Sequence, residues 1–358
     1  MAENANIFEN CTAHYSFEHI YEICTNSSTP CDLINSLHTA YLIRLWLSFY
    51  ISSVISLTAI FLDIYLLSVV IKLLLNLNEQ KSKRYVFLFV RLLSEMLLAI
   101  SIIVFQSTIS INYNGLYTFY AILFVVSDFS VFTILGSFTG VAMTTYCGVM
   151  RPLFYRDKLT LKVMYLIVIG ICVISAAISI PFGLLQAANI VEGPIECDTY
   201  SCQFVVTWLL YCLSSIILIG STLILVFVTG SLYWLSYKSK KMGNLTYSPT
   251  EHGRARLAWT SAILIIFSCI EIIPTGLALA FDTKSDICDE FYGADRVVTS
   301  AIISSLETLF GSFTFLIEPV VNYFFDVHIS NIISFQMKSV CSKLFCSSTS
   351  STTKKETP

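Results

Sequence analysis

Seven apolar stretches, each long enough to cross a lipid bilayer as a helix, constrain this chain more than any other feature of its sequence. A hydrocarbon core about 30 Å thick needs about 20 helical residues at a rise of about 1.5 Å per residue. The stretches are Trp46–Leu75, Tyr85–Ser107, Thr118–Val149, Leu161–Gln186, Phe204–Tyr237, Leu257–Ala280 and Val297–Phe325. Charged residues are 13% of the chain, about half the share in soluble domains. We predict an all-α membrane protein, a bundle of seven transmembrane helices.

The charged residues outside these stretches predict how the chain crosses the membrane. On one side, three basic and thirteen acidic residues lie in the amino-terminal segment and the loops at 108–117, 187–203 and 281–296. On the other side, sixteen basic and five acidic residues lie in the loops at 76–84, 150–160 and 237–256, at Lys162 and in the carboxyl-terminal tail. Segments rich in Lys and Arg stay in the cytosol. The amino terminus is therefore predicted to lie outside the cell.

Composition divides the chain into four parts. We expect a polar extracellular tail at 1–45, the transmembrane domain at 46–325, an amphipathic juxtamembrane helix at 326–346 and a disordered cytoplasmic tail at 347–358. The first part has no positively charged start and no apolar core of the secretory kind. The first membrane helix is therefore expected to direct insertion.

Modification signals lie near both ends of the chain. Asn10 and Asn26 each begin an Asn-x-Ser/Thr sequon in the predicted extracellular tail, so we expect both to be glycosylated. Cys341 and Cys346 lie at the end of the predicted juxtamembrane helix, either as acylation sites or as unmodified thiols. That helix is predicted to lie on the inner leaflet because its apolar residues recur at spacings of three and four. They are Ile329, Ile332, Ile333, Met337, Val340 and Leu344.

Ionisable residues inside the predicted spans are costly in lipid, so each one needs a partner, a cavity or a function. Asp128, Glu271 and Glu307 stand nine or ten residues below the outer ends of their helices, about 15 Å deep. Three carboxyl groups at one depth can line a ligand cavity, accepting hydrogen bonds when ionised or donating them when protonated. The alternative is that they are neutral acids that hydrogen-bond one helix to another.

A second layer of charges lies nearer the predicted cytosolic side. Its carboxyl groups belong to Asp63, Glu95 and Glu318. Arg91 precedes Glu95 by four residues, so the two side chains share a helix face. We expect these residues and Pro319 to form an intramembrane polar network. Arg91 forms either a static ion pair with Glu95 or a pairing that differs between signalling states.

Three segments resemble rhodopsin-like G-protein-coupled receptors. MRPLFYR at 150–156 is similar to their second intracellular loop, LLSEMLLAI at 92–100 to their second helix and EPVVNYFF at 318–325 to the end of their seventh. Only the tyrosine of the Asp-Arg-Tyr triplet is kept, at Tyr146, and the sixth stretch lacks the usual tryptophan. These departures make the chain more similar to the divergent serpentine chemoreceptors of nematodes, with the subfamily open between class bc and class xa.

The resemblance implies a rhodopsin-like bundle with an interfacial eighth helix. It further implies a chemosensory receptor of the plasma membrane, or of the sensory cilium, that binds a small external ligand and activates a heterotrimeric G protein. No cofactor or metal is expected. By position, the residues that would face the G protein are Thr145, Tyr146, Arg151 and Pro152.

The usual disulfide of rhodopsin-like receptors has no counterpart here. It joins the outer end of the third helix to the second outer loop, but this chain has no cysteine between Ile109 and Phe119. We expect Cys197 and Cys202 to pair with each other, or else with the amino-terminal tail or Cys288.

Two other classes of function compete with the receptor. A transporter or ligand-gated ion channel would use the buried carboxylates as an ion path. Against it, the two halves of the chain show no repeat and no matching pair of broken helices. An enzyme is not expected, because the sequence has no metal-spaced His pair, no phosphate-binding Gly loop and no nucleophile elbow.

Overall fold

The computed structural model of the chain describes residues 38–77, 79–110, 116–191, 204–241, 294–326 and 328–336. Helices make up nearly all of these residues, and no strand occurs among them. The sixth predicted stretch, Leu257–Ala280, lies outside the described residues, as does most of the amino-terminal tail.

The first two membrane helices are longer than hydropathy predicts. A short π-helix, η1 (Arg44–Ile51), continues directly into α4 (Ser52–Asn76), and α5 spans Glu79–Ser110. The apolar stretch that predicted α5 begins only at Tyr85. Hydropathy marks the part of a helix that lies in lipid, whereas backbone hydrogen bonding continues into polar sequence.

The other helices follow in chain order. They are α6 (Tyr117–Met150), α7 (Pro152–Asp157), α8 (Leu161–Ile190), α9 (Phe204–Lys241), α12 (Ala294–Phe325) and a helix at 328–336. Five segments are long and apolar enough to cross a membrane: His38–Asn76, Tyr85–Thr108, Tyr117–Gly148, Leu161–Ala188 and Ala301–Phe324. In α9 the apolar segment is shorter, Tyr211–Ile224. The predicted all-α membrane bundle is confirmed, with helices at six of the seven predicted stretches.

The helix α7 is a feature that the sequence did not predict. The backbone leaves helical geometry at Arg151, and Pro152 is the first residue of α7. Proline suits that position because its missing N–H would have no partner within the helix. The predicted break at Pro152 therefore occurs, but a helical turn follows it. Thr160 then begins α8, its side chain accepting a hydrogen bond from the backbone N–H of Val163.

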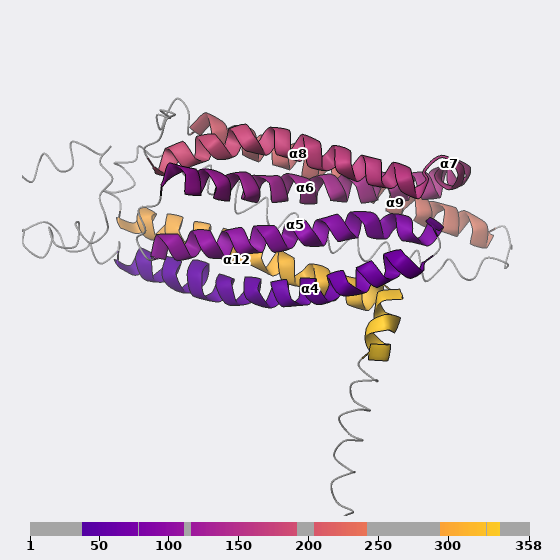
Figure 1. Cartoon of the computed structure of the whole chain (residues 1–358), viewed down its shortest axis with the longest axis horizontal. Helices are drawn as coiled ribbons and strands as arrows, with labels where there is room; N and C mark the ends of the chain where they lie inside the picture. The colour runs from indigo at the N-terminus through magenta and orange to yellow at the C-terminus, as the bar shows by residue number, and fades with distance from the viewer. Residues whose placement is uncertain are drawn as a thin grey trace, which may run out of the picture.

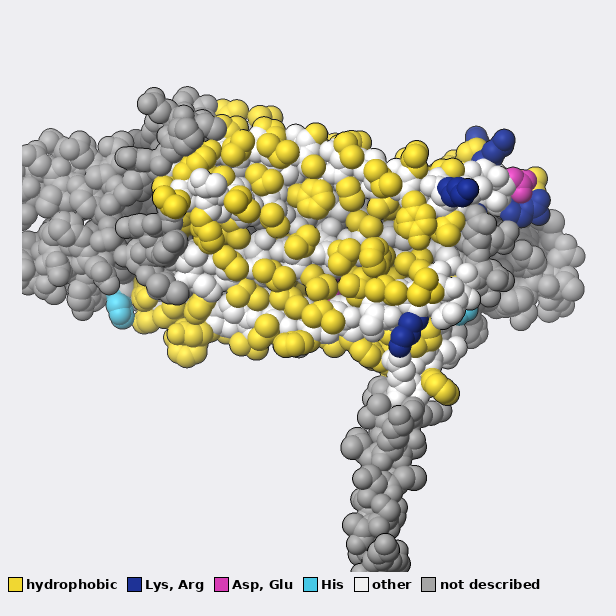
Figure 2. Space-filling view, in the orientation of Figure 1, with side chains coloured by type: hydrophobic (Ala, Val, Ile, Leu, Met, Phe, Trp, Pro, Cys, Tyr) yellow, Lys and Arg dark blue, Asp and Glu magenta, His cyan; other side chains and the backbone are white. Residues whose placement is uncertain are grey.

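Among the described helices, α6 has a central place (Figure 1). It packs against α5, α8 and α9, while α4 packs against α5 and α12. The first and last of the described membrane helices are thus neighbours. Hydrophobic side chains cover the visible face along the bundle, and Lys and Arg side chains gather at the end that carries α7 (Figure 2). We refer to this end as the α7 end; it is the end predicted to be cytosolic.

The helices α6 and α8 approach each other closely at a glycine of α8. A Cβ added to Gly183 of α8 would lie 2.5 Å from the backbone nitrogen of Val125 of α6. Real atoms do not pack at that distance, so a side chain at this position would push the helices apart. Small residues allow the backbones of membrane helices to approach closely, and Gly183 therefore sets the spacing of this pair.

The helix at 328–336 packs against the bundle itself. Ile329 and Ile333 are buried, in one apolar cluster with residues of α4 and α5 such as Val70 and Tyr85. The segment runs across the direction of the long helices, at the α7 end (Figure 1). Part of the apolar face that we expected to lie on the inner leaflet is therefore covered by α4 and α5. The rest of the predicted juxtamembrane helix, from Met337 on, lies outside the described residues.

Candidate functional site

A buried ion pair lies in the middle of α5. Nε of Arg91 is 3.2 Å from Oε1 of Glu95, and the two side chains are 8% and 5% exposed. The Arg91 guanidinium carbon also lies 3.9 Å from the centre of the Phe138 ring, a cation–π contact with α6. The helical spacing brings the pair together, and the aromatic ring of α6 covers its cationic member.

Asp63 of α4 completes this buried charge cluster. It is 0% exposed, and neither of its carboxyl oxygens has a hydrogen-bond partner among the residues that the structure describes. It interacts electrostatically with Glu95 and Arg91. Among the described side chains, two carboxyl groups therefore share one guanidinium. An unbalanced buried charge is costly, so this cluster favours the uptake of a proton or cation, or a change in pairing.

Buried hydroxyl side chains also lie on α4, α6 and α12. The hydroxyl of Ser56 donates to the hydroxyl of Ser312 at 3.3 Å, joining α4 to α12. On α6 and α12, three further hydroxyls are buried and have no hydrogen-bond partner within the described residues: those of Thr133, Ser137 and Ser305. Buried polar groups in proteins are usually satisfied by protein or by ordered water. These hydroxyls could therefore bind ordered water within the bundle.

Of the three predicted outer carboxyls, the structure describes one. Asp128 of α6 lies toward α8, where the Gln186 side chain hydrogen-bonds its carboxyl group. Its Oδ2 atom is buried and has no hydrogen-bond partner in the described part of the chain. Glu271 lies outside the described residues, and Glu307 is on α12 but its side chain is not described. The described geometry thus joins Asp128 to Gln186, which the sequence did not predict as a partner.

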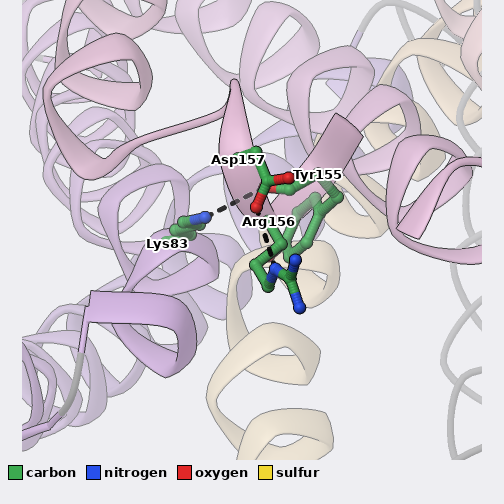
Figure 3. Close-up of polar contacts among 4 residues, drawn as sticks. All are labelled: Lys83, Tyr155, Arg156 and Asp157. Atoms are coloured by element: carbon green, nitrogen blue, oxygen red, sulfur yellow. Dashed lines mark hydrogen bonds and ion pairs between the residues drawn. The ribbon is translucent and has the colours of Figure 1, made fainter. Parts of the chain in front are cut away.

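At the α7 end, Lys83 holds α7 against the start of α5 (Figure 3). Its Nζ atom donates to the backbone carbonyl of Tyr155 at 3.0 Å and lies 4.7 Å from the centre of the Tyr155 ring. Lys83 is only 2% exposed. A cation near the carboxyl end of a helix is favourable. On the exposed side of α7, Arg156 contacts Asp157 at 2.8 Å and thereby lowers the pKa of that carboxyl group.

A second contact at this end joins α5 to the helix at 328–336. The Tyr85 hydroxyl donates to the carboxyl group of Asp326, at 3.0 Å from Oδ1. The same Oδ1 accepts hydrogen bonds from the backbone N–H groups of His328 and Ile329, at 2.9 and 3.2 Å. Asp326 therefore caps the amino terminus of this helix and fixes it to α5.

The predicted G-protein-facing residues lie at the junction of α6 and α7. Arg151 is exposed, and its backbone N–H donates to the carbonyl of Cys147. The Tyr146 ring lies 6.3 Å from that of Phe227 of α9. The backbone of Thr145 and Pro152 is helical, but their side chains are not described.

Comparison with known proteins assigns the chain to a family. No protein-family model matches it. The Caenorhabditis elegans protein named "Putative G-protein coupled receptor-like protein B0244.6" is 30% identical over 340 residues, which are 93% of this chain and 90% of that protein. The chain belongs to this family of nematode G-protein-coupled receptors.

Two further C. elegans relatives agree with the family of this receptor. "Putative G-protein coupled receptor B0244.10" is 50% identical over 351 residues, 97% of the receptor chain. The receptor spans 60% of the length of that longer protein. "Putative G-protein coupled receptor B0244.5" is 27% identical over 91% of both chains. The family resemblance inferred from short segments is confirmed.

Several predicted sites of the receptor lie where the structure gives no account of them. The side chain of Glu318 on α12 is not described, although Pro319 beside it is buried within that helix. The predicted modification sites and disulfide cysteines lie outside the described residues: Asn10, Asn26, Cys197, Cys202, Cys341 and Cys346. They stay predictions.

Sequence reasoning missed several residues that the structure brings together. The capping role of Asp326 could have been predicted, because an acidic residue just before an amphipathic stretch is a known start signal for a helix. Phe138, Gln186 and Lys83 gave no such signal, since their partners lie on other helices. Those contacts depend on how the helices rotate against one another.

Proposed function

We propose that this receptor binds a small external chemical among its helices and activates a heterotrimeric G protein. The proposal rests mainly on one comparison. The chain is 30% identical to a protein named as a putative G-protein-coupled receptor-like protein, over 93% of this chain and 90% of that protein. The helical bundle with buried charges at its centre agrees with this role, because a receptor needs an element with two arrangements of similar free energy.

Ligand binding is assigned to the half of the bundle away from α7. Asp128 carries a buried oxygen with no described hydrogen-bond partner, and Gln186 stands beside it. A carboxyl and an amide offer both acceptors and donors, which suits a small polar or cationic molecule. Glu271 and Glu307 remain candidates for the same cavity.

The charge cluster of Asp63, Arg91 and Glu95 is proposed as the internal switch. Arg91 has two carboxyl groups within its electrostatic reach, so a small displacement of α4 against α5 would change which one it pairs with. A ligand that favours one arrangement of the helices shifts the population toward it. The static alternative is an Arg91–Glu95 pair kept only for packing and insertion.

The G protein is proposed to engage the α7 end. Tyr146, Arg151 and α7 lie there, together with Thr145 and Pro152 by position. Lys83 holds α7 in place. We further propose that the amino terminus is extracellular and that the receptor acts at the plasma membrane, including the cilium of sensory cells.

A ligand screen in cells tests the proposal. Cells that express the full chain are exposed to a panel of small water-soluble and volatile chemicals while calcium and cyclic nucleotides are recorded. We expect at least one chemical to produce a response that disappears when G-protein activation is blocked by a non-hydrolysable GDP analogue. A ligand-evoked membrane current that persists under that block would instead favour a channel. Val54→Ala, at a 66% exposed position of α4 outside the proposed sites, serves as an expression-matched control.

A further inference from the structure

A cavity of about 440 Å³ lies between α6, α8 and α9. Its wall is formed mainly by aliphatic and aromatic side chains, with Phe132 and Cys147 marking its extent along α6. It reaches the outer surface of the bundle at Ile174 of α8, which is 62% exposed. We call it the lateral cavity. Three hydroxyl residues line this cavity: Thr139, Thr144 and Ser175. Thr139 and Thr144 donate their hydroxyls to carbonyls of α6 itself. Ser175 is 3% exposed, and its backbone carbonyl accepts a hydrogen bond from the Ser179 hydroxyl.

The position of the lateral cavity decides what can fill it. Its α6 wall lies entirely within the membrane-spanning segment Tyr117–Gly148. Water is a poor occupant, because a buried water molecule needs two to four polar partners. An empty space would deprive the lining atoms of dispersion contacts. A hydrocarbon chain from the bilayer supplies those contacts and brings no polar group that needs a partner.

Basic residues stand where this cavity approaches the α7 end. The backbone N–H of Arg151 donates to the carbonyl of the lining residue Cys147 at 3.0 Å, and Lys158 directly precedes the lining residue Leu159. Both side chains are exposed. Asp157 interacts electrostatically with both Arg156 and Lys158, but its 2.8 Å contact is with Arg156, which is therefore the less available of the two for a headgroup. Clusters of basic residues at this level of a membrane attract anionic lipid headgroups.

We propose that the lateral cavity binds one acyl chain of an anionic glycerophospholipid whose headgroup contacts Arg151 and Lys158. The second acyl chain stays in the bilayer against the exposed face of α8, beside Val173 and Ile174. The site is separate from the buried charges of α4 and α5, and its occupation does not depend on signalling.

Lipid binding to the purified, delipidated full chain tests this proposal. The probes are palmitoyl-oleoyl phosphatidylserine and the phosphatidylcholine with the same chains, added to the protein in detergent and counted by native mass spectrometry. Each basic residue near a headgroup contributes about a fivefold preference for the anionic lipid. We expect wild type to bind one phosphatidylserine at least tenfold more tightly than phosphatidylcholine. Equal affinities would overturn the proposal.

Matched variants locate the acyl chain. Ile217→Trp on α9 fills the cavity, whereas Ile216→Trp places the same side chain on the neighbouring, 68% exposed position that does not line it. Ile174→Trp is a second filling variant, on the exposed face of α8. We expect both filling variants to weaken phosphatidylserine binding at least tenfold and Ile216→Trp to leave it unchanged. If the two filling variants bind phosphatidylserine as tightly as Ile216→Trp does, the assignment of the cavity is wrong.

Charge variants locate the headgroup. Arg151→Gln and Lys158→Gln are each expected to weaken phosphatidylserine binding about fivefold and to leave phosphatidylcholine binding unchanged. Lys72→Gln removes an exposed charge from α4, away from the cavity, and is the control. Losses no larger than that of Lys72→Gln would overturn the headgroup contact. Displacement of phosphatidylserine by one equivalent of oleate would show a fatty acid as the occupant and would also overturn the proposal.

A measurement on the wild-type chain needs no variant to fold. Cys147 lines the cavity and Cys212 is exposed on α9. Labelling by N-ethylmaleimide, followed by peptide mapping, should slow at least fivefold at Cys147 when phosphatidylserine is added, relative to Cys212. An unchanged ratio of the two labelling rates would contradict occupation of the cavity.

Discussion

Arg91 interacts with both carboxyl groups of the buried charge cluster. It pairs with Glu95 at 3.2 Å, contacts the Phe138 ring and interacts with Asp63 from another helix. Two carboxylates and one guanidinium leave an excess negative charge if all are ionised. Ion pairs in a low-dielectric interior hold together mainly because separating them is costly. In the switch proposed above, this unequal count among the described side chains would let small shifts of α4 against α5 change the pairing of Arg91.

Removal of the Arg91 charge should destabilise the receptor more than removal of either carboxylate. Arg91→Gln removes the one cation that Asp63 and Glu95 share among the described side chains, and breaking a buried ion pair in this way costs about 3–5 kcal/mol. Glu95→Gln leaves a balanced pair of Asp63 and Arg91 and should cost less. The double variant Arg91→Gln, Glu95→Gln should recover part of the loss. Thermal unfolding and surface expression measure this order. Equal stability of Arg91→Gln and the exposed control Arg156→Gln would contradict it.

Contacts between residues of one helix were predictable from the sequence, whereas contacts between residues of different helices were not. The four-residue spacing of Arg91 and Glu95 predicted a pair on one helix face, and the pair is present. The cation–π contact of Phe138 with Arg91 could not be predicted, and neither could the hydrogen bond between Gln186 and Asp128. Each of those contacts depends on the rotation of one helix against another, which many distant packing contacts determine together.

At the scale of elements, the glycine contact between α6 and α8 predicts the effect of two alanine substitutions on stability. Gly183→Ala would place a methyl group 2.5 Å from the Val125 backbone, and overpacking of this kind costs about 1–3 kcal/mol. Gly170→Ala on the same helix meets nothing within 4 Å, and should be neutral or slightly stabilising because alanine favours helices. Thermal unfolding of the two variants in one detergent makes the comparison. The reverse order of stabilities would contradict the close approach.

The cap at the helix 328–336 gives a second prediction for an element. Asp326→Ala removes the acceptor for two backbone N–H groups and for the Tyr85 hydroxyl, and loss of a cap costs about 1 kcal/mol. Asp326→Asn keeps a side-chain oxygen in the capping position. Amide hydrogen exchange at Ile329 and Ile333 should therefore accelerate in Asp326→Ala and much less in Asp326→Asn. Equal exchange in both variants would show that apolar packing alone holds this helix.

The elements themselves were largely predictable because a bilayer imposes their length and polarity. The apolar stretches gave six of the described helices, though not their ends: Glu79 begins α5 well before the first apolar residue at Tyr85. The helix α7 was missed because Pro152 was interpreted as a break alone. Proline at the first position of a helix is also a start signal, and both readings apply here.

At the scale of the whole molecule, the orientation in the membrane is open to a direct test. The unequal distribution of basic residues predicts that Asn10 and Asn26 lie outside the cell and that Asn244 lies inside. Glycosidase treatment should shift the electrophoretic mobility of wild type but not of the double variant Asn10→Gln, Asn26→Gln. A residual shift that disappears with Asn244→Gln would reverse the orientation and place the α7 end outside.

Our proposal is that this bundle activates a G protein and that its buried charges bias the active state. Its most direct test is nucleotide exchange on purified heterotrimers by the full receptor in lipid nanodiscs, compared with empty discs. We predict that at least one heterotrimer class exchanges nucleotide faster with the receptor. Asp63→Asn, which balances the charge cluster, should change that rate about fivefold. Exchange at the rate of empty discs for every heterotrimer class would contradict coupling, and an unchanged rate in Asp63→Asn would contradict the role of the buried charges.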